Sequence, residues 1–140
     1  MSSTVSSIEL EPEAIAAAAA AIPDGQPFAM LNLLRYREQA DYGDRADEPP
    51  CSGREAYHGR YIPAFGAVAP EGIQLFWYGG VLARLVGSTD ERWDEVALVR
   101  YPSFAHFRRV VENPRYLAEA APHRRAALAD LRLIAIAEAS

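Results

Sequence analysis

The sequence predicts a single α+β domain, with four antiparallel strands in one sheet and two helices on one face of it. The chain has 140 residues, of which 50% are hydrophobic and 24% are charged, as expected of one ordinary folded domain. After a first helix, apolar runs typical of strands alternate with segments of helical periodicity in the order β-α-β-β-α-β. The expected strands are apolar on both faces, so one face of the sheet is left for a partner to cover.

A short helix is expected before this core. Pro12 and Glu13 precede a run of alanines, which places a proline in the first turn and an acid near the positive end of the helix dipole. A turn cluster at residues 23–25 ends the helix. Its apolar face is shallow, so the helix is expected to lie on the body of the protein or on a partner subunit. We assign residues 1–25 to an N-terminal helical extension and residues 26–140 to the main domain.

The first strand and a long loop follow. Residues 28–34 are large and apolar, which is typical of a strand buried on both faces, and Asn32 is their one polar interruption. Residues 35–53 are polar and show no periodicity, so they predict a surface loop. A loop of this length inside a small domain is uncommon and is often functional.

The next helix has a clear start. Ser52 and Glu55 have the spacing of a capping box, in which a hydroxyl and a carboxylate bind the first amides of a helix. Tyr57 and Tyr61 lie on one apolar stripe at helical spacing, and Pro63 is expected to kink the helix.

The second half repeats this layout. Ile73–Trp77 and Val81–Val86 are both β-like, and Gly79 and Gly80 between them predict a bulge or a sharp bend. Residues 93–101 form the next expected strand.

A helix in two pieces and a last strand complete the pattern. Ser103 begins the first piece, and Asn113-Pro114 supplies a cap and a first helical position for the second piece, which continues through Leu128. Residues 131–137 close the chain as a strand.

Right-handed crossovers fold this order into the ferredoxin-like plan, a four-stranded antiparallel sheet with both helices on one face. The uncovered face is apolar, and homodimerisation face to face buries it most simply, because a two-fold contact is self-complementary.

Several segments in this order and spacing resemble the DUF1330 family, over roughly residues 26–138. They are Pro27–Tyr36, Gly53–Tyr57, Tyr78-Gly79-Gly80, Trp93–Val96, Tyr101-Pro102-Ser103, Asn113–Tyr116 and His123-Arg124. The resemblance implies a dimeric α/β barrel, a superfamily that includes cofactor-independent monooxygenases, polyketide cyclases, lactone isomerases and haem enzymes. DUF1330 is a domain of unknown function, so the resemblance implies no particular activity.

Composition and charge exclude several classes. A net charge of -5 and an acidic pI argue against nucleic acid as a partner. No apolar run is long enough to span a membrane and the first residues make a poor signal peptide, so the expected location is the cytoplasm. Cys51 is the single cysteine and is interpreted as incidental, which excludes an internal disulfide. His58, His106 and His123 are far apart in sequence, with no carboxylate cluster beside them, so no metal and no cofactor are expected.

Candidate catalytic residues are His123 and Tyr61. His123 lies beside Arg124 and Arg125, whose charges are expected to lower its pKa and keep the imidazole neutral for proton transfer. The alternative is a surface histidine on a basic helix face. A tyrosine hydroxyl, for which we choose Tyr61, could donate to a developing oxyanion.

Candidate substrate-binding residues are polar or aromatic side chains at expected sheet and helix positions: Asn32, Trp77, Trp93, Arg100, Tyr116 and Arg124. Asn32 could orient a substrate carbonyl or could satisfy a backbone group. The aromatics could line a ligand cavity or belong to the core. Arg100 could clamp a carboxylate, or could form an ion pair with Asp94 or Glu95.

The leading functional hypothesis is a small-molecule enzyme without an organic cofactor, acting on a modest apolar or aromatic oxygenated metabolite. The first alternative is a non-catalytic module that binds or senses a small molecule in the same cavity. The second is a structural protein that docks through its acidic loop, residues 41–48.

Overall fold

The computed structural model describes residues 8–45 and 47–138. Its strands are β1 (Phe28–Tyr36), β2 (Gln74–Gly80), β3 (Glu95–Tyr101) and β4 (Leu128–Ala137). Its helices are α1 (Pro12–Ala21), α2 (Gly53–Glu55), the π-helix η1 (Ala56–Tyr61), α3 (Ile62–Val68), α4 (Phe104–Val111), α5 (Pro114–Glu119) and α6 (Ala121–Ala127).

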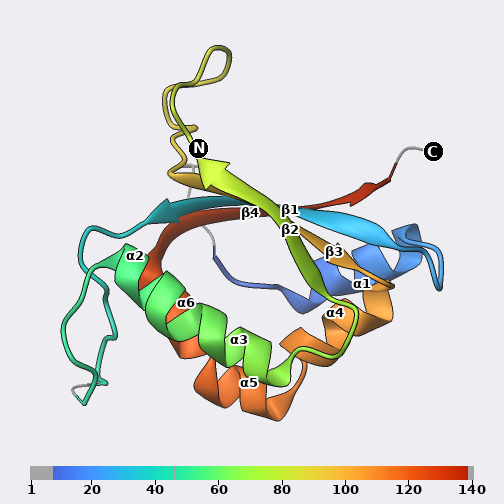
Figure 1. The fold of residues 1–140 in the computed structure, drawn as a ribbon, viewed down its shortest axis with the longest axis horizontal. Coiled ribbons are helices and arrows are strands. Elements are labelled where there is room, and N and C mark those ends of the chain that lie inside the picture. The colour runs from blue at the N-terminus through green and yellow to red at the C-terminus, as the bar shows by residue number, and fades with distance from the viewer. Residues whose placement is uncertain (1–7, 46, 139–140) are drawn as a thin grey trace.

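The four strands form one antiparallel sheet in the order β2-β3-β1-β4. The helices that follow β1 and β3 lie on one side of this sheet, and the other side carries no helix (Figure 1). The predicted α+β class and its four-stranded antiparallel sheet are therefore confirmed.

Local signals in the sequence form the expected caps. Ser52 accepts from the Glu55 amide at 3.0 Å and Glu55 accepts from the Ser52 amide at 2.8 Å, which completes the capping box. Ser103 and Asn113 cap α4 and α5 with their side chains. Pro12 and Pro114 lie in first turns, where the missing N–H costs no hydrogen bond.

The disturbance expected at Pro63 takes the form of a π-helical turn just before it. The Ile62 amide bonds to the Tyr57 carbonyl, five residues back, and Pro63 has no amide with which to continue the normal ladder. Tyr57 and Tyr61 belong to this wider turn, and both are buried. Single π turns of this kind are frequent at functional sites.

The core lies between the sheet and the helix layer. Phe28, Met30 and Leu34 of β1 face the helices and are at most 5% exposed. Because neighbouring strand residues point to opposite faces, Leu31 and Leu33 lie on the outer face. The cross-strand partners there include Val96, Leu98 and Ile134, and Ile134 and Ile136 are exposed. One apolar sheet face is thus uncovered in this chain.

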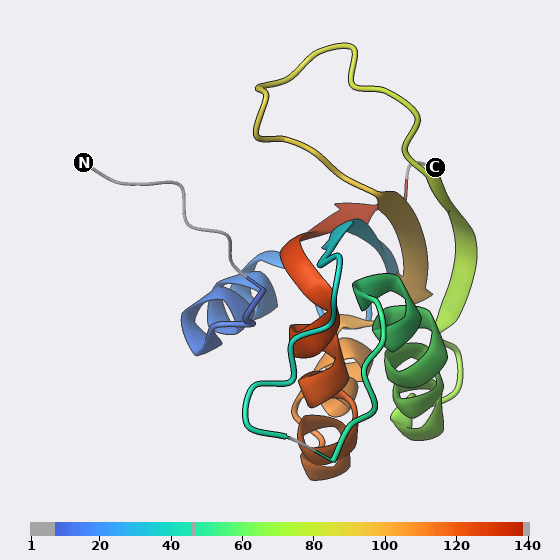
Figure 2. The same ribbon diagram turned by 90° about the vertical axis from the view of Figure 1, so that its left-hand side faces the viewer.

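The prediction of a strand at Val81–Val86 is wrong. Pairing between β2 and β3 ends at Gly80 opposite Glu95, and the last contact is a hydrogen bond from the Val81 amide to the Asp94 carbonyl. Residues 81–94 then form an arm that projects from the uncovered side of the sheet (Figure 2). β-propensity reflects packing against neighbouring strands, and no strand accompanies this segment. Leu82, for example, is 100% exposed.

The other boundary corrections are small. β1 runs to Tyr36, and β4 begins at Leu128, where helix had been expected. The predicted long loop is confirmed over residues 37–45 and 47–52. Its backbone is joined to the end of α6 by hydrogen bonds from the Arg37 and Asp41 amides.

The described part of the N-terminal extension, residues 8–25, lies on the body of the protein, as one of the two alternatives predicted. Ile15, Ala18, Ala19 and Ile22 are partly buried against the core. Within the described residues, no helix is long and apolar enough to cross a bilayer.

Candidate functional site

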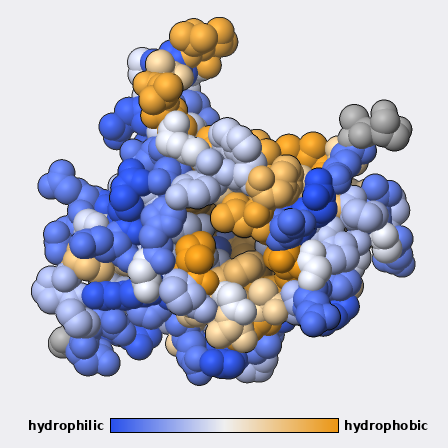
Figure 3. Space-filling view, in the orientation of Figure 1, coloured by the Kyte–Doolittle hydropathy of each residue, from blue (hydrophilic) through white to orange (hydrophobic). Residues whose placement is uncertain are grey.

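A groove of about 510 Å³ opens between β2 on one side and η1 and α3 on the other. Its wall is mainly apolar, with Ile62, Phe65, Ile73, Leu75 and Val99 among its residues. Figure 3 shows hydrophobic side chains around a hollow at this place. Volume and lining are those of a typical small-molecule site.

Four polar side chains from four elements meet at one end of this groove. Glu95 of β3 accepts a hydrogen bond from the Tyr36 hydroxyl of β1 at 2.5 Å. The same carboxylate oxygen lies 2.9 Å from Nε2 of His58 of η1, and the other oxygen pairs with Arg54 of α2. His58 and Glu95 both line the groove. We call these four residues the Glu95 cluster.

The Glu95 cluster is anionic at its centre. Burial alone would raise the pKa of Glu95, but hydrogen bonds from Tyr36 and His58 and the charge of Arg54 lower it below its usual range. Burial, and then the hydrogen bond to Glu95, raise the pKa of Tyr36, so its hydroxyl keeps its proton. Tyr36 is therefore a donor to an ionised carboxylate.

This arrangement orients His58. An ionised Glu95 only accepts hydrogen bonds, so it selects the tautomer of neutral His58 with the proton on Nε2. The Nδ1 atom then carries the lone pair. No hydrogen bond to Nδ1 occurs among the described residues. A carboxylate that fixes the tautomer of a histidine beside a cleft is the arrangement of a general base.

A smaller inner cavity of about 70 Å³ adjoins the groove and lies deeper in the core. The two spaces share five lining residues: Asn32, Tyr57, Ile62, Phe65 and Val99. The Tyr61 and Tyr116 hydroxyls are 3.0 Å apart at the inner cavity, and Arg124 also lines it. Burial raises the pKa of Tyr61 well above its ordinary value, so this hydroxyl stays protonated.

The structure therefore brings four of the predicted site residues together: Asn32, Tyr61, Tyr116 and Arg124. Asn32 donates from Nδ2 to the carbonyls of Met30 and Ala97, at 3.0 and 3.3 Å, so its amide satisfies backbone groups. This is the structural alternative predicted for Asn32. Asn32 still lines both cavities, so the ligand-binding role stays a prediction.

His123 lies elsewhere, on α6 against the long loop. Its Nδ1 is 2.7 Å from the Tyr42 hydroxyl, to which Arg60 also donates. The pKa of His123 is lowered as predicted, but the causes are burial first and then the charges of Arg60 and Arg45, partly opposed by Glu48. Arg124 and Arg125 are not the cause. His123 lines neither the groove nor the inner cavity.

Trp77, Trp93 and Arg100 also lie outside both cavities. Trp77 and Arg100 are on the outer face of the sheet, where Trp77 pairs with Leu98. The expected partners of Arg100 are wrong, because it forms an ion pair with Glu138 at 3.0 Å. Glu95 points to the opposite face of the sheet from Arg100.

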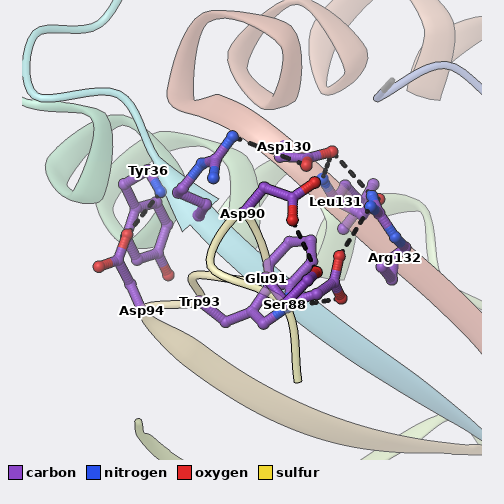
Figure 4. Close-up of polar contacts among 10 residues, drawn as sticks. Tyr36, Ser88, Asp90, Glu91, Trp93, Asp94, Asp130, Leu131 and Arg132 are labelled. Atoms are coloured by element: carbon purple, nitrogen blue, oxygen red, sulfur yellow. Dashed lines mark hydrogen bonds and ion pairs between the residues drawn. The ribbon is translucent and has the colours of Figure 1, made fainter. Parts of the chain in front are cut away.

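Trp93 lies at the base of the arm. The Arg132 guanidinium is 4.9 Å from the centre of its ring, and Arg132 also bonds to Asp130 and Glu91. Figure 4 shows these side chains gathered where the arm meets β4. The ligand-binding roles of Trp77, Trp93 and Arg100 stay predictions. Trp93 borders a separate hollow of about 470 Å³ that is formed by residues of the arm.

Sequence reasoning missed the Glu95 cluster, because its members are far apart in the chain. The sequence places no carboxylate cluster beside His58, and the fold supplies a carboxylate from β3. Two features of the sequence mark this region. Tyr57 and Tyr61 form an apolar stripe on either side of His58, and Pro63 follows in the same helical segment. In the described part of the chain, no three His, Cys, Asp or Glu side chains gather to hold a metal ion.

Comparison with known proteins identifies a relative whose structure has been solved. No family model matches the chain, and no curated protein matches it. A crystal structure of the methylated RPA0582 protein superposes with a TM-score of 0.84 at 36% identity, and the match covers 98% of each chain. A second structure of RPA0582, from Rhodopseudomonas palustris, gives a TM-score of 0.83 at 36% identity, covering 98% of this chain and 99% of that one.

RPA0582 is described as a protein of unknown function. The likeness extends over nearly the whole length of both chains, so it includes the extension, the long loop and the arm as well as the sheet. The chain belongs to the same family as the RPA0582 protein of Rhodopseudomonas palustris.

Proposed function

We propose that this protein is an enzyme that acts on a modest apolar or aromatic oxygenated metabolite by proton transfer, with His58 as the general base. The observation that carries this proposal is the Glu95 cluster at the wall of an apolar groove. The groove supplies room and apolar contact for a small ligand. His58 supplies a lone pair, and Glu95 orients it and stabilises the imidazolium that forms when a proton is taken.

The chemical step that fits is removal of a proton from the carbon next to a carbonyl group of the substrate. The electron pair left behind moves toward the carbonyl oxygen, which becomes an enolate or a related oxyanion. The proton moves to His58 Nδ1 and can return to another atom of the same molecule. The product is then an isomer of the substrate, and the reaction requires no second reactant.

The experiment begins with a thermal-shift screen of neutral and acidic metabolites, followed by a turnover assay of the hits. The His58→Gln variant should bind a substrate hit but lose turnover about 100-fold or more, as general-base losses commonly do. His106→Gln is the matched control, because His106 lies on α4 and bonds to Ser103 outside the groove. Equal losses in the two variants would contradict the assignment.

A non-catalytic binding or sensing module is the second candidate. The observation in its favour is that Tyr57 and Tyr61 at the inner cavity keep their protons, because burial raises the pKa of each hydroxyl. Such groups hold a ligand by donating hydrogen bonds and do not exchange protons near neutral pH. A hit that binds tightly and is recovered unchanged after long incubation supports this candidate over the enzyme.

We also propose that the chain is a ferredoxin-like protomer of DUF1330 type that pairs through its outer sheet face into a dimeric α/β barrel. The strand order β2-β3-β1-β4 and the apolar outer face support this. Burial of that face in a homodimer removes exposed Trp77, Ile134 and Ile136 from water. Light scattering that gives the mass of one chain at micromolar concentration would contradict the pairing.

A further inference from the structure

Arg124 is a buried charge without a counter-ion. Arg124 lies on α6 and is 5% exposed. Its Nε atom has no hydrogen-bond partner. None of the ion pairs in the described part of the chain includes it. A buried unpaired ion costs several kcal/mol of stability, on the order of the whole contribution of a good core side chain. A group retained at such a cost needs an explanation.

The protein groups around Arg124 cannot neutralise it. The side chain lines the inner cavity together with Tyr57, Tyr61 and Tyr116. Burial raises the pKa of both Tyr57 and Tyr61, and the nearby charge of Arg124 lowers it only in part. The hydroxyls of Tyr57 and Tyr61 therefore stay neutral, and both residues line the cavity as potential hydrogen-bond donors. The inner cavity is a set of donors with a positive charge and no anion.

We propose that the inner cavity binds the carboxylate of an apolar monocarboxylic acid, with the carboxylate on Arg124 and the body of the molecule in the groove. The inference deepens the proposed function and rests on it. A guanidinium binds the two oxygens of a carboxylate through two parallel hydrogen bonds. Because one of the paired hydroxyls of Tyr61 and Tyr116 donates to the other, the second keeps a proton for the ligand.

Size and charge select this class of ligand. The inner cavity, at about 70 Å³, is several times the ~10–15 Å³ that one buried water needs, so it has room for a head group. It holds one positive charge in a mainly apolar wall, which matches one negative charge better than the two of a phosphate. The adjoining groove of about 510 Å³ then takes an apolar body that extends toward His58. The reacting atom would lie on that body, away from the anchored carboxylate.

The test uses trans-cinnamate and its neutral isostere, cinnamamide, as probes in isothermal titration near pH 7. The expected result is that the acid binds the wild-type protein about 10-fold or more tightly than the amide, the preference that a charge-assisted pair gives. In Arg124→Met, of similar length and no charge, the preference should vanish. Arg125→Met is the matched control, since Arg125 lies on the same helix and pairs with Glu9 on the surface.

The outcomes separate this inference from the proposed function. Equal binding of acid and amide to the wild type overturns the carboxylate anchor and leaves the groove as a binding site. Retention of the preference in Arg124→Met also overturns it. Binding of neither probe overturns the carboxylate class, and the screen with neutral metabolites then decides the proposed function by itself. If Arg124→Met does not fold, the relative affinity of the wild-type protein for the acid and the amide still tests the carboxylate anchor.

Discussion

Replacement of Glu95 by glutamine should destabilise the protein strongly at neutral pH. The carboxylate is buried, with 10% of its side chain exposed, and it accepts from the Tyr36 hydroxyl and from His58. A hydrogen bond to a charged group contributes about 1.5–3 kcal/mol. Arg54 is half exposed, so its ion pair adds little, and release of the buried charge offsets part of the loss. The expected loss is roughly 2–4 kcal/mol of unfolding free energy.

The loss should depend on pH in a defined direction. The pKa of Glu95 is lower in the folded protein than in the unfolded chain, where it is about 4.3. The unfolded state therefore binds the proton first as pH falls. The contribution of Glu95 is fully present above about pH 4.3 and is lost as pH falls through the lower folded value. The difference between wild type and Glu95→Gln should shrink in the same range.

Urea unfolding followed by circular dichroism, near pH 7 and at acid pH, measures both effects. Glu112→Gln is the control, because Glu112 forms an exposed pair with Arg108 one turn away and should change stability by less than about 0.5 kcal/mol. A Glu95→Gln variant as stable as that control at neutral pH would refute the reasoning. So would a loss that stays constant on acidification.

Three further predictions concern the parts that position the site. Gly53→Ala should lower unfolding free energy by more than about 2 kcal/mol in urea titrations, because its Cβ would lie 2.2 Å from the Arg37 carbonyl oxygen; Gly59→Ala, with nothing within 4 Å, should not. His123→Asn should abolish the part of the stability loss seen as pH falls below about 6.5, since burial keeps the imidazole neutral and protonation favours unfolding; an unchanged pH profile refutes this. Asn113→Ala should lower the free energy of unfolding by about 1 kcal/mol in thermal unfolding, because the α5 cap is lost. A change near zero would show that the cap does not stabilise the protein.

The sequence predicted the elements whose cause is local. The capping box at Ser52, the cap at Asn113 and the strand around Met30 each follow from neighbouring residues, and each is confirmed. Val81–Val86 has the same β-branched and aliphatic character as a strand, but a strand also needs a partner, and the chain provides none there.

The candidate site also contains residues that the sequence could indicate and residues that only the fold brings together. Asn32 stood out as a polar residue in an apolar run, and its place at the two cavities agrees with that signal. His58 and Glu95 gave no such signal, because their meeting depends on the pairing of β1 with β3 and on the position of η1 above the sheet. His123 stood out through its neighbours in sequence, but the neighbours that matter are those of the long loop.

The most direct test of the central claim is a crystal structure of the protein with a hit from the ligand screen. The account predicts electron density for the ligand in the groove between β2 and α3, with a polar ligand atom within hydrogen-bond distance of His58. Density confined to another part of the surface, or a groove closed by its own side chains, would contradict the assignment of this space as the functional site.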